Sequence, residues 1–315
     1  MSNKIPVGDT IAKSYNFVIE DFLPILGIIW FPGALMTAAG YWLSGQVTQN
    51  LQDATGRNDL TQLIHALPFV GLGYLAVLLL VAMQYLGVTE LALGMRGKRT
   101  FFYFSLGKTF WLLIAAWFLV FLLLVGVEIG IGIASGISAA IFGAVTVAAG
   151  AHPLSGSATG IMLFGVFAVV ALFYCAFLYA TVRLTYLLPP AVVAEKKIAI
   201  GSAWSLSRGN FGRIVVIWLA VTLPALFVIQ TIEFTLIFPT MMETLLNVVQ
   251  HPGPPGQIWP IYVQMIQKAS SMAHAHWYIL YPVGVLLGVI YFGLTAGAHA
   301  FAYRALVPGE ETKAA

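Results

Sequence analysis

The chain has 315 residues, of which 60% are hydrophobic and only 9% are charged, and its mean hydropathy is +0.90. Soluble domains carry about 25% charged residues, so this composition excludes a soluble globular domain, a disordered chain, a nucleic-acid binder and a disulfide-rich secreted module. The net charge of +3 is too small to indicate an acidic partner, and one cysteine cannot form an internal disulfide. The sequence therefore predicts an integral membrane protein whose surroundings are the lipid bilayer.

Six stretches are long and apolar enough to cross a membrane as helices, since one crossing needs about 20 mostly apolar residues. A β-barrel would instead show short segments of alternating hydrophobicity. The predicted fold is an all-α, polytopic membrane helix bundle that forms a single domain over residues 1–315, with short amphipathic interfacial helices. The six predicted transmembrane helices are Phe22–Trp42, Pro68–Leu93, Phe110–Ile133, Ile161–Leu188, Ile214–Phe238 and Trp277–Tyr303.

The distribution of positive charge predicts the orientation of these spans. All 15 lysines and arginines except Arg57 and Lys268 fall on one side of the six-span topology. Positive loops stay cytoplasmic because moving them across the membrane during insertion is costly. We therefore expect a multi-pass protein with both termini in the cytoplasm.

Two connections are longer than a simple hairpin requires. The apolar stretch from Phe110 to Gly150 leaves two alternatives: the third helix extends beyond the membrane, or Ala139–Ala149 lies along the outer interface. The longest polar insertion, Thr240–His276, is interrupted by Pro252–Gly256, and two short amphipathic helices are predicted to flank that break.

A weak three-fold repeat of helix pairs is a further hypothesis. Phe104–Lys108 resembles Trp204–Arg208, and the segment around Phe17–Phe22 aligns with the same region. Each copy would be a cytoplasmic amphipathic helix followed by an outward and an inward span. The first such helix would lie along the inner leaflet or pack under the bundle. The alternative is that membrane-entry segments resemble one another because all are aromatic and basic.

Ionisable residues within spans are the candidate functional residues, because they are costly in lipid. Glu90, Arg183 and Arg304 occupy related positions at cytoplasmic ends of inward-running spans and could form one charge cluster, with direct pairing of Glu90 and Arg183. The alternative is a set of snorkelling side chains or a pair that fixes helix packing.

Glu128 and Glu233 lie in the outer parts of the third and fifth spans, where a carboxylate could act as a proton or cation relay or could sit hydrated at the interface. Gln84 and His299 are expected to hydrogen-bond neighbouring helices. His274 and His276 lack a third ligand at zinc spacing. No catalytic motif, metal site or cofactor site is predicted, and we do not expect an enzyme.

Four Gly-x-x-x-Gly faces, which let helix backbones approach closely, are expected to serve packing within the chain more than dimerisation. They begin at Gly126, Gly132, Gly284 and Gly293.

One recurring pattern carries a family resemblance. An arginine ends a span in Arg183–Glu195 (RLTYLLPPAVVAE), and Ala203–Asn210 (AWSLSRGN) then precedes a new span. This pattern resembles an uncharacterised bacterial six-helix inner-membrane protein family, which is similar to the membrane domain fused to some glycerophosphodiester phosphodiesterases. The resemblance implies a six-span helical bundle in a bacterial plasma membrane. It implies no activity, because the phosphodiesterase residues belong to a separate soluble domain.

Two functions from different classes follow from these observations. The first is a non-enzymatic scaffold or envelope-associated interaction domain that binds a membrane protein partner or forms a homo-oligomer. The alternative is a transporter or channel for a small or lipid-like solute, which proline-interrupted spans beside a polar cavity would favour.

Overall fold

A computed structural model of the chain describes residues 4–57, 61–97, 101–148, 156–250, 267–268, 271–272 and 275–307. All regular secondary structure within these ranges is helical. Six helices are long and apolar enough to cross a membrane, as the sequence predicts. They are α2 (Phe22–Arg57), α3 (Thr61–Ala92), α4 (Lys108–Ala148), α5 (Gly156–Thr185), α8 (Phe211–Gln250) and α10 (Trp277–Leu306).

Three of these helices, α2, α4 and α8, continue at least ten residues beyond the predicted spans. α4 is one continuous helix of 41 residues, so the first of the two alternatives for Phe110–Gly150 is the one that the structure shows. At 1.5 Å per residue it is about 60 Å long, twice the thickness of a hydrocarbon core. α8 continues through Pro239 to Gln250, into the region that was predicted to be a polar insertion. The break at Pro252–Gly256 lies outside the described residues.

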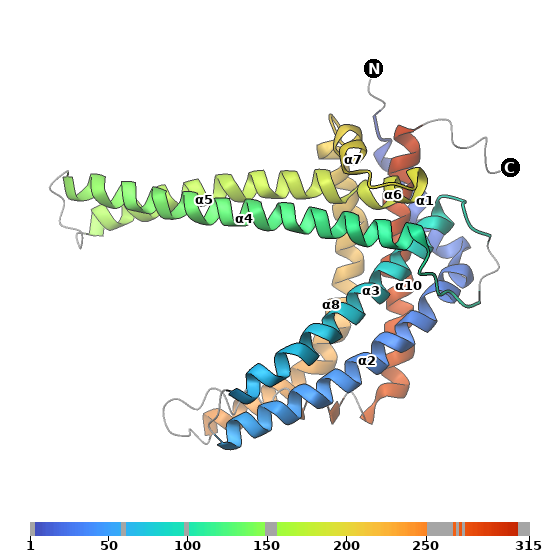
Figure 1. Cartoon of the computed structure of the whole chain (residues 1–315), viewed down its shortest axis with the longest axis horizontal. Helices are drawn as coiled ribbons and strands as arrows, with labels where there is room; N and C mark the ends of the chain where they lie inside the picture. Colours follow the sequence, from blue (N-terminus) through green and yellow to red (C-terminus); the bar gives the residue numbers. More distant parts are fainter. Residues whose placement is uncertain are drawn as a thin grey trace.

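The helices meet in a compact region that we call the hub. It comprises the short helices α1 (Val7–Glu20), α6 (Leu188–Glu195) and α7 (Ile200–Leu206) together with the adjoining ends of the long helices. Most of the fully buried large side chains lie there, including Tyr103, Phe110, Leu187, Leu188 and Tyr303. From the hub the α4–α5 hairpin extends to one side, while α2, α3, α8 and α10 run together in another direction, as Figure 1 shows.

α6 was not anticipated, because the fourth span was predicted to run to Leu188 as a single helix. The structure ends α5 at Thr185 and begins a separate short helix at Leu188. Pro189 and Pro190 stand in its first turn, where backbone N–H groups have no helical acceptor and their loss costs little. The residues Leu188–Val193 are all buried, so this part of the recurring pattern belongs to the core.

Two of the three copies in the repeat hypothesis begin with a short helix. One precedes α2 and another precedes α8, but residues 101–107, which precede α4, form no helix. The aromatic run Phe101–Phe104 favours an extended backbone here. Tyr103 is buried while Phe102 and Phe104 on either side of it are exposed. The predicted amphipathic helix of the middle copy was therefore wrong.

α1 packs along the bundle instead of lying apart from it. The ring of Phe17 meets Phe301 of α10 edge to face at 5.7 Å, and the hydroxyl of Tyr15 donates to the carbonyl of Ala220 in α8. Because α10 presents glycines at Gly293 and Gly297, the α1 side chains approach its backbone closely. This interface confirms the intramolecular role that was expected for that Gly-x-x-x-Gly face.

Candidate functional site

Arg183 joins the end of α5 to α7 inside the hub. Its Nε donates to the hydroxyl of Ser207 at 3.0 Å, and its terminal nitrogens donate to the carbonyl of Trp204 at 2.6 Å and to the hydroxyl of Tyr179 at 2.9 Å. The guanidinium also lies over the Trp204 ring, 3.8 Å from its centroid. Only 6% of Arg183 is exposed. Trp204 and Ser207 lie at the carboxyl end of α7, where the helix dipole favours a cation, so this arginine of α5 fastens the two helices together.

The residues that follow in the recurring pattern fasten the start of the chain. Gly209 has a φ of 76°, in the left-handed region that favours glycine, and turns the chain from α7 into α8. Asn210 Oδ1 then accepts the backbone N–H of Ile5 at 3.1 Å, and Arg213 donates to the carbonyl of Ile5 at 2.7 Å. The sequence marked this pattern only by resemblance, whereas the structure gives its residues specific contacts within the hub.

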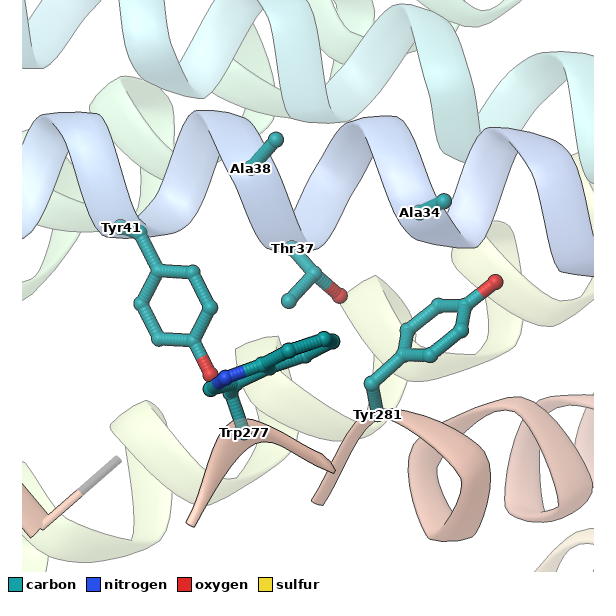
Figure 2. Close-up of a pocket in the computed structure, with 6 residues that line it drawn as sticks. All are labelled: Ala34, Thr37, Ala38, Tyr41, Trp277 and Tyr281. Carbon is teal, nitrogen blue, oxygen red and sulfur yellow. The ribbon is translucent and has the colours of Figure 1, made fainter. Parts of the chain in front are cut away.

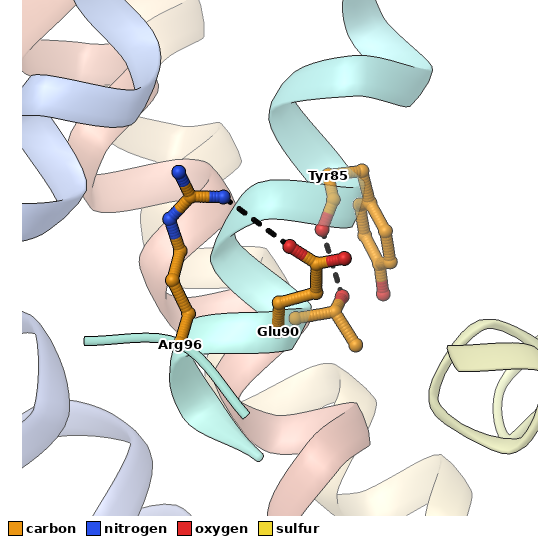
Figure 3. A network of polar contacts seen from close by, with 4 residues as sticks. Tyr85, Glu90 and Arg96 are labelled. Carbon is orange, nitrogen blue, oxygen red and sulfur yellow. Dashed lines mark hydrogen bonds and ion pairs between the residues drawn. The ribbon is translucent and has the colours of Figure 1, made fainter. Parts of the chain in front are cut away.

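Glu90 forms its ion pair at the end of α3. Its Oε2 lies 3.3 Å from a terminal nitrogen of Arg96, as Figure 3 shows. The Arg96 guanidinium lies 4.2 Å from the centroid of the Tyr103 ring, and burial raises the pKa of that tyrosine. Arg96 lies six residues after Glu90, shortly beyond the end of α3. The Glu90 carboxylate therefore has a partner that is close in the sequence.

The predicted contact between Glu90 and Arg183 is absent from the ion pairs and hydrogen bonds that join the described residues. The structure instead gives each residue its own partners. Arg304 lies in a third place, where it lines a cavity of about 240 Å³ together with Asp9 and Lys13 of α1. The three residues thus share the hub without forming one charge cluster through these contacts.

A cluster of three side chains, Tyr85, Tyr186 and His299, connects α3, α10 and the turn between α5 and α6. The hydroxyl of Tyr85 shares a hydrogen bond with Nδ1 of His299, and the His299 ring lies 4.0 Å from the ring of Tyr186. Tyr186 is 3% exposed, and its hydroxyl has no hydrogen-bond partner among the described residues. The expectation that His299 bonds a neighbouring helix is confirmed.

The two candidate relay carboxylates lie far from this group along the chain. Glu128 is exposed on α4, in the hairpin that extends away from the hub. Glu233 lies within α8, and its side chain is outside the described residues. Their role as relay or interface groups stays a prediction.

Within the described parts of the chain, no group of three or more His, Cys, Asp or Glu side chains is arranged to hold a metal ion. His276 bonds the carbonyl of Met272, and His274 lies outside the described residues.

A cavity of about 360 Å³ lies between α2 and α10, where sequence reasoning had placed nothing. Figure 2 shows Trp277 and Tyr281 rising from α10 toward α2, with Tyr41 beside Trp277. The α2 residues that line it recur at helical spacing and share one face. The complete lining is Ala34, Thr37, Ala38, Tyr41, Trp277 and Tyr281.

A second cavity of about 210 Å³ adjoins the first, because Thr37 and Tyr281 line both. Gln84 of α3 and the glycines Gly33 and Gly288 also line it. We call the two together the α2–α10 cavity. None of its lining residues is charged.

Two carbonyls in the turn before Pro32 accept side-chain hydrogen bonds from other helices beside this cavity. Gln84 Nε2 donates to the carbonyl of Ile29 at 3.2 Å, and the Tyr281 hydroxyl donates to the carbonyl of Trp30 at 2.7 Å. The expectation that Gln84 bonds a neighbouring helix is thereby confirmed.

Comparisons of the chain with protein-family models, with curated proteins and with solved structures each return no match.

Proposed function

We propose that this integral membrane protein is a non-enzymatic scaffold of a bacterial plasma membrane, in which the α4–α5 hairpin binds a transmembrane helix of a protein partner. The hub, which contains the predicted cytoplasmic residues, would hold the chain together. The hairpin extends away from the other spans and so offers side faces that the rest of the chain does not cover (Figure 1).

The glycines of α4 carry this proposal. A Cβ atom built on any of Gly126, Gly130, Gly132 and Gly136 meets nothing within 4 Å, whereas one built on Gly293 in α10 comes within 2.7 Å of Val18. The α10 face is thus filled by this chain, and the α4 faces are open. Small residues allow another helix to approach closely in lipid, where no hydrophobic effect drives helices together.

Native mass spectrometry of the full-length chain, purified from its bacterial host in mild detergent, tests the proposal. We expect a stoichiometric partner on the wild-type chain, and we expect Gly130→Leu to reduce its occupancy at least tenfold because leucine blocks close approach. Leu172→Phe, which adds bulk at an exposed position of α5, is the matched control and should retain the partner.

Wild-type chain without any partner, or unchanged partner occupancy in Gly130→Leu, would contradict the scaffold proposal. If the mass of the bound protein equals that of the chain itself, the hairpin forms a homo-oligomer.

A second candidate function is transport of a lipid-like solute. The α2–α10 cavity favours it, because Pro32 and Pro282 interrupt the hydrogen-bond ladders of the two helices that enclose the cavity. Reconstituted protein would then move a lipid analogue between the leaflets of a liposome, and a rate equal to that of protein-free liposomes would exclude this function.

A further inference from the structure

We propose that the segment between α3 and α4 binds anionic phospholipid beside the hub end of α2, with its phenylalanine rings among the lipid headgroups. The surface that makes this contact, which we call the aromatic patch, consists of Trp30 and Phe31 of α2 and Phe101, Phe102 and Phe104 of the segment. The inference does not depend on the scaffold function, because it uses neither the α4 glycines nor a protein partner.

One buried residue fixes this segment against the helices. The Tyr103 ring is 1% exposed, and it lies so close to α3 that a Cβ atom built on Gly87 would come within 2.7 Å of it. The indole N–H of Trp30 donates to the carbonyl of Phe101, which ties the segment to α2 as well. Because successive side chains of an extended backbone point to opposite faces, the residues before and after Tyr103 are turned outward.

The aromatic patch leaves three large rings uncovered by the described parts of the chain. Phe101 is 82% exposed, Phe102 is 52% exposed and Phe104 is 51% exposed. Phe102 lies against Phe31 with the two ring centroids 4.0 Å apart, and Phe101 lies 5.5 Å from Trp30. Exposed apolar groups gathered in this way mark an interaction surface, since leaving them in water is unfavourable.

The position of the patch on α2 indicates that lipid covers it. Trp30 and Phe31 belong to Phe22–Val47, the part of α2 that is apolar enough to cross a membrane. Figure 1 shows the α3–α4 segment beside the start of α2, so the patch continues a surface that faces the bilayer. Irregular backbone does not occur against lipid within the hydrocarbon region, and a tryptophan ring is favoured among the headgroups. Both observations place the patch at headgroup level.

Positive charge around the patch selects an anionic lipid. From Gly94 to Lys108 the sequence holds four basic residues and no acidic one. Arg96 lies over the Tyr103 ring at the base of the patch, and Lys108 is exposed at the start of α4. Basic clusters of this size next to a span attract anionic headgroups. Because Glu90 partly balances the charge of Arg96, removal of Lys108 should have the clearer effect.

Fluorescence quenching on the full-length chain in nanodiscs tests the inference. In a Cys175→Ser background, Phe102→Cys carries an environment-sensitive dye, and Lys13→Cys, at an exposed position of α1, is the matched control. The nanodiscs contain equal amounts of phosphatidylcholine and phosphatidylglycerol, and one of the two lipids at a time carries a nitroxide near the top of an acyl chain.

We expect about threefold more quenching at position 102 than at position 13, because the dye at position 102 lies among the headgroups. Labelled phosphatidylglycerol should quench position 102 about twofold more than labelled phosphatidylcholine. Lys108→Gln should lower this preference, whereas Lys196→Gln, at another exposed position of the hub, should leave it unchanged.

Quenching at position 102 no greater than at position 13 would overturn the inference. A dye at position 102 that aqueous iodide quenches as strongly as the dye at position 13 would also overturn it, and would assign the patch to a soluble protein partner. Equal quenching by the two labelled lipids would contradict the selection of an anionic lipid. These comparisons use two labelled positions in one background, so the result does not depend on whether the Lys108 variant folds.

Discussion

Glycines at equal spacing play different roles in this chain because their neighbours differ. A Cβ atom built on Gly293 would lie against side chains of α1 and α2, whereas one built on Gly130 meets nothing within 4 Å. The sequence shows the same small-residue spacing at both positions and so cannot separate a packed face from an open one.

We predict that Gly293→Ala lowers the free energy of unfolding by about 1–3 kcal/mol, because the new Cβ would lie 2.7 Å from Val18 Cγ2 and force α1 to shift. Gly130→Ala is the control and should be neutral or slightly stabilising, since alanine is the better helix former. Thermal unfolding in detergent measures both. Equal melting temperatures for the two variants would contradict the close packing of α1 on α10.

Arg183 shows what a buried cation needs when its acceptors are neutral. Planar geometry lets one guanidinium reach Ser207, Trp204 and Tyr179 at once, which a lysine ammonium on a flexible stem cannot reproduce. Sequence reasoning selected Arg183 correctly as a residue of interest. It missed Trp204 and Ser207 because they lie in and directly after a seven-residue helix whose position only the tertiary structure defines.

We therefore expect Arg183→Lys to destabilise the protein by about 2 kcal/mol although the charge is kept, because hydrogen bonds to a charged group are worth about 1.5–3 kcal/mol each. Limited proteolysis should cut first between α6 and α7, near the exposed Lys197. Arg208→Lys, at an exposed position, is the matched control. A proteolysis pattern identical to that of the wild type would show that the hydrogen bonds of Arg183 do not hold α7 in place.

At the scale of elements, two polar contacts join α2 to α3 and α10. The apolar pattern predicts the helix, but it does not predict that the carbonyls of Ile29 and Trp30 accept from Gln84 of α3 and Tyr281 of α10. A polar side chain between membrane helices needs a partner within the protein, and here the backbone of α2 supplies it.

Tyr281→Phe should accordingly cost about 0.6 kcal/mol, the mean value for a side-chain hydrogen bond between membrane helices. Tyr278→Phe removes a hydroxyl from a tyrosine that is 59% exposed and should leave the unfolding free energy unchanged. Chemical unfolding in mixed micelles measures the two variants side by side. A larger effect at Tyr278 would contradict the assignment of the Trp30 contact.

Over the whole molecule, the six spans and the charge distribution predict which surfaces face the cytoplasm. The described ends of the chain and the positive residues Lys13 and Lys196 belong to the hub. α2 runs away from the hub, so its carboxyl-terminal end lies far from these residues (Figure 1). The positive-inside rule therefore predicts that the hub faces the cytoplasm.

Cysteine labelling in a Cys175→Ser background checks this orientation. Lys13→Cys and Lys196→Cys should react with a membrane-impermeant maleimide only after the cells are permeabilised, while Gln49→Cys should react in intact cells. All three positions are exposed. Labelling of Lys13→Cys in intact cells would reverse the topology.

The fold class, the membrane location and the six spans are predictable from the sequence. Each of these depends on local properties, namely the length and apolarity of a segment. The sequence also identified Gln84 and His299 as residues that bond other helices, because a polar side chain in lipid needs a partner.

Which helices meet follows from the folded structure and not from the sequence pattern. The structure separates α6 from α5, gives Glu90 and Arg183 different partners, leaves the α4 glycines open and forms the α2–α10 cavity. These features depend on contacts between residues far apart in the chain, such as Trp30 and Tyr281. In a chain that is 60% hydrophobic, many pairings of apolar helix faces look alike, so periodicity cannot choose among them, whereas side-chain shape and a few buried polar contacts do.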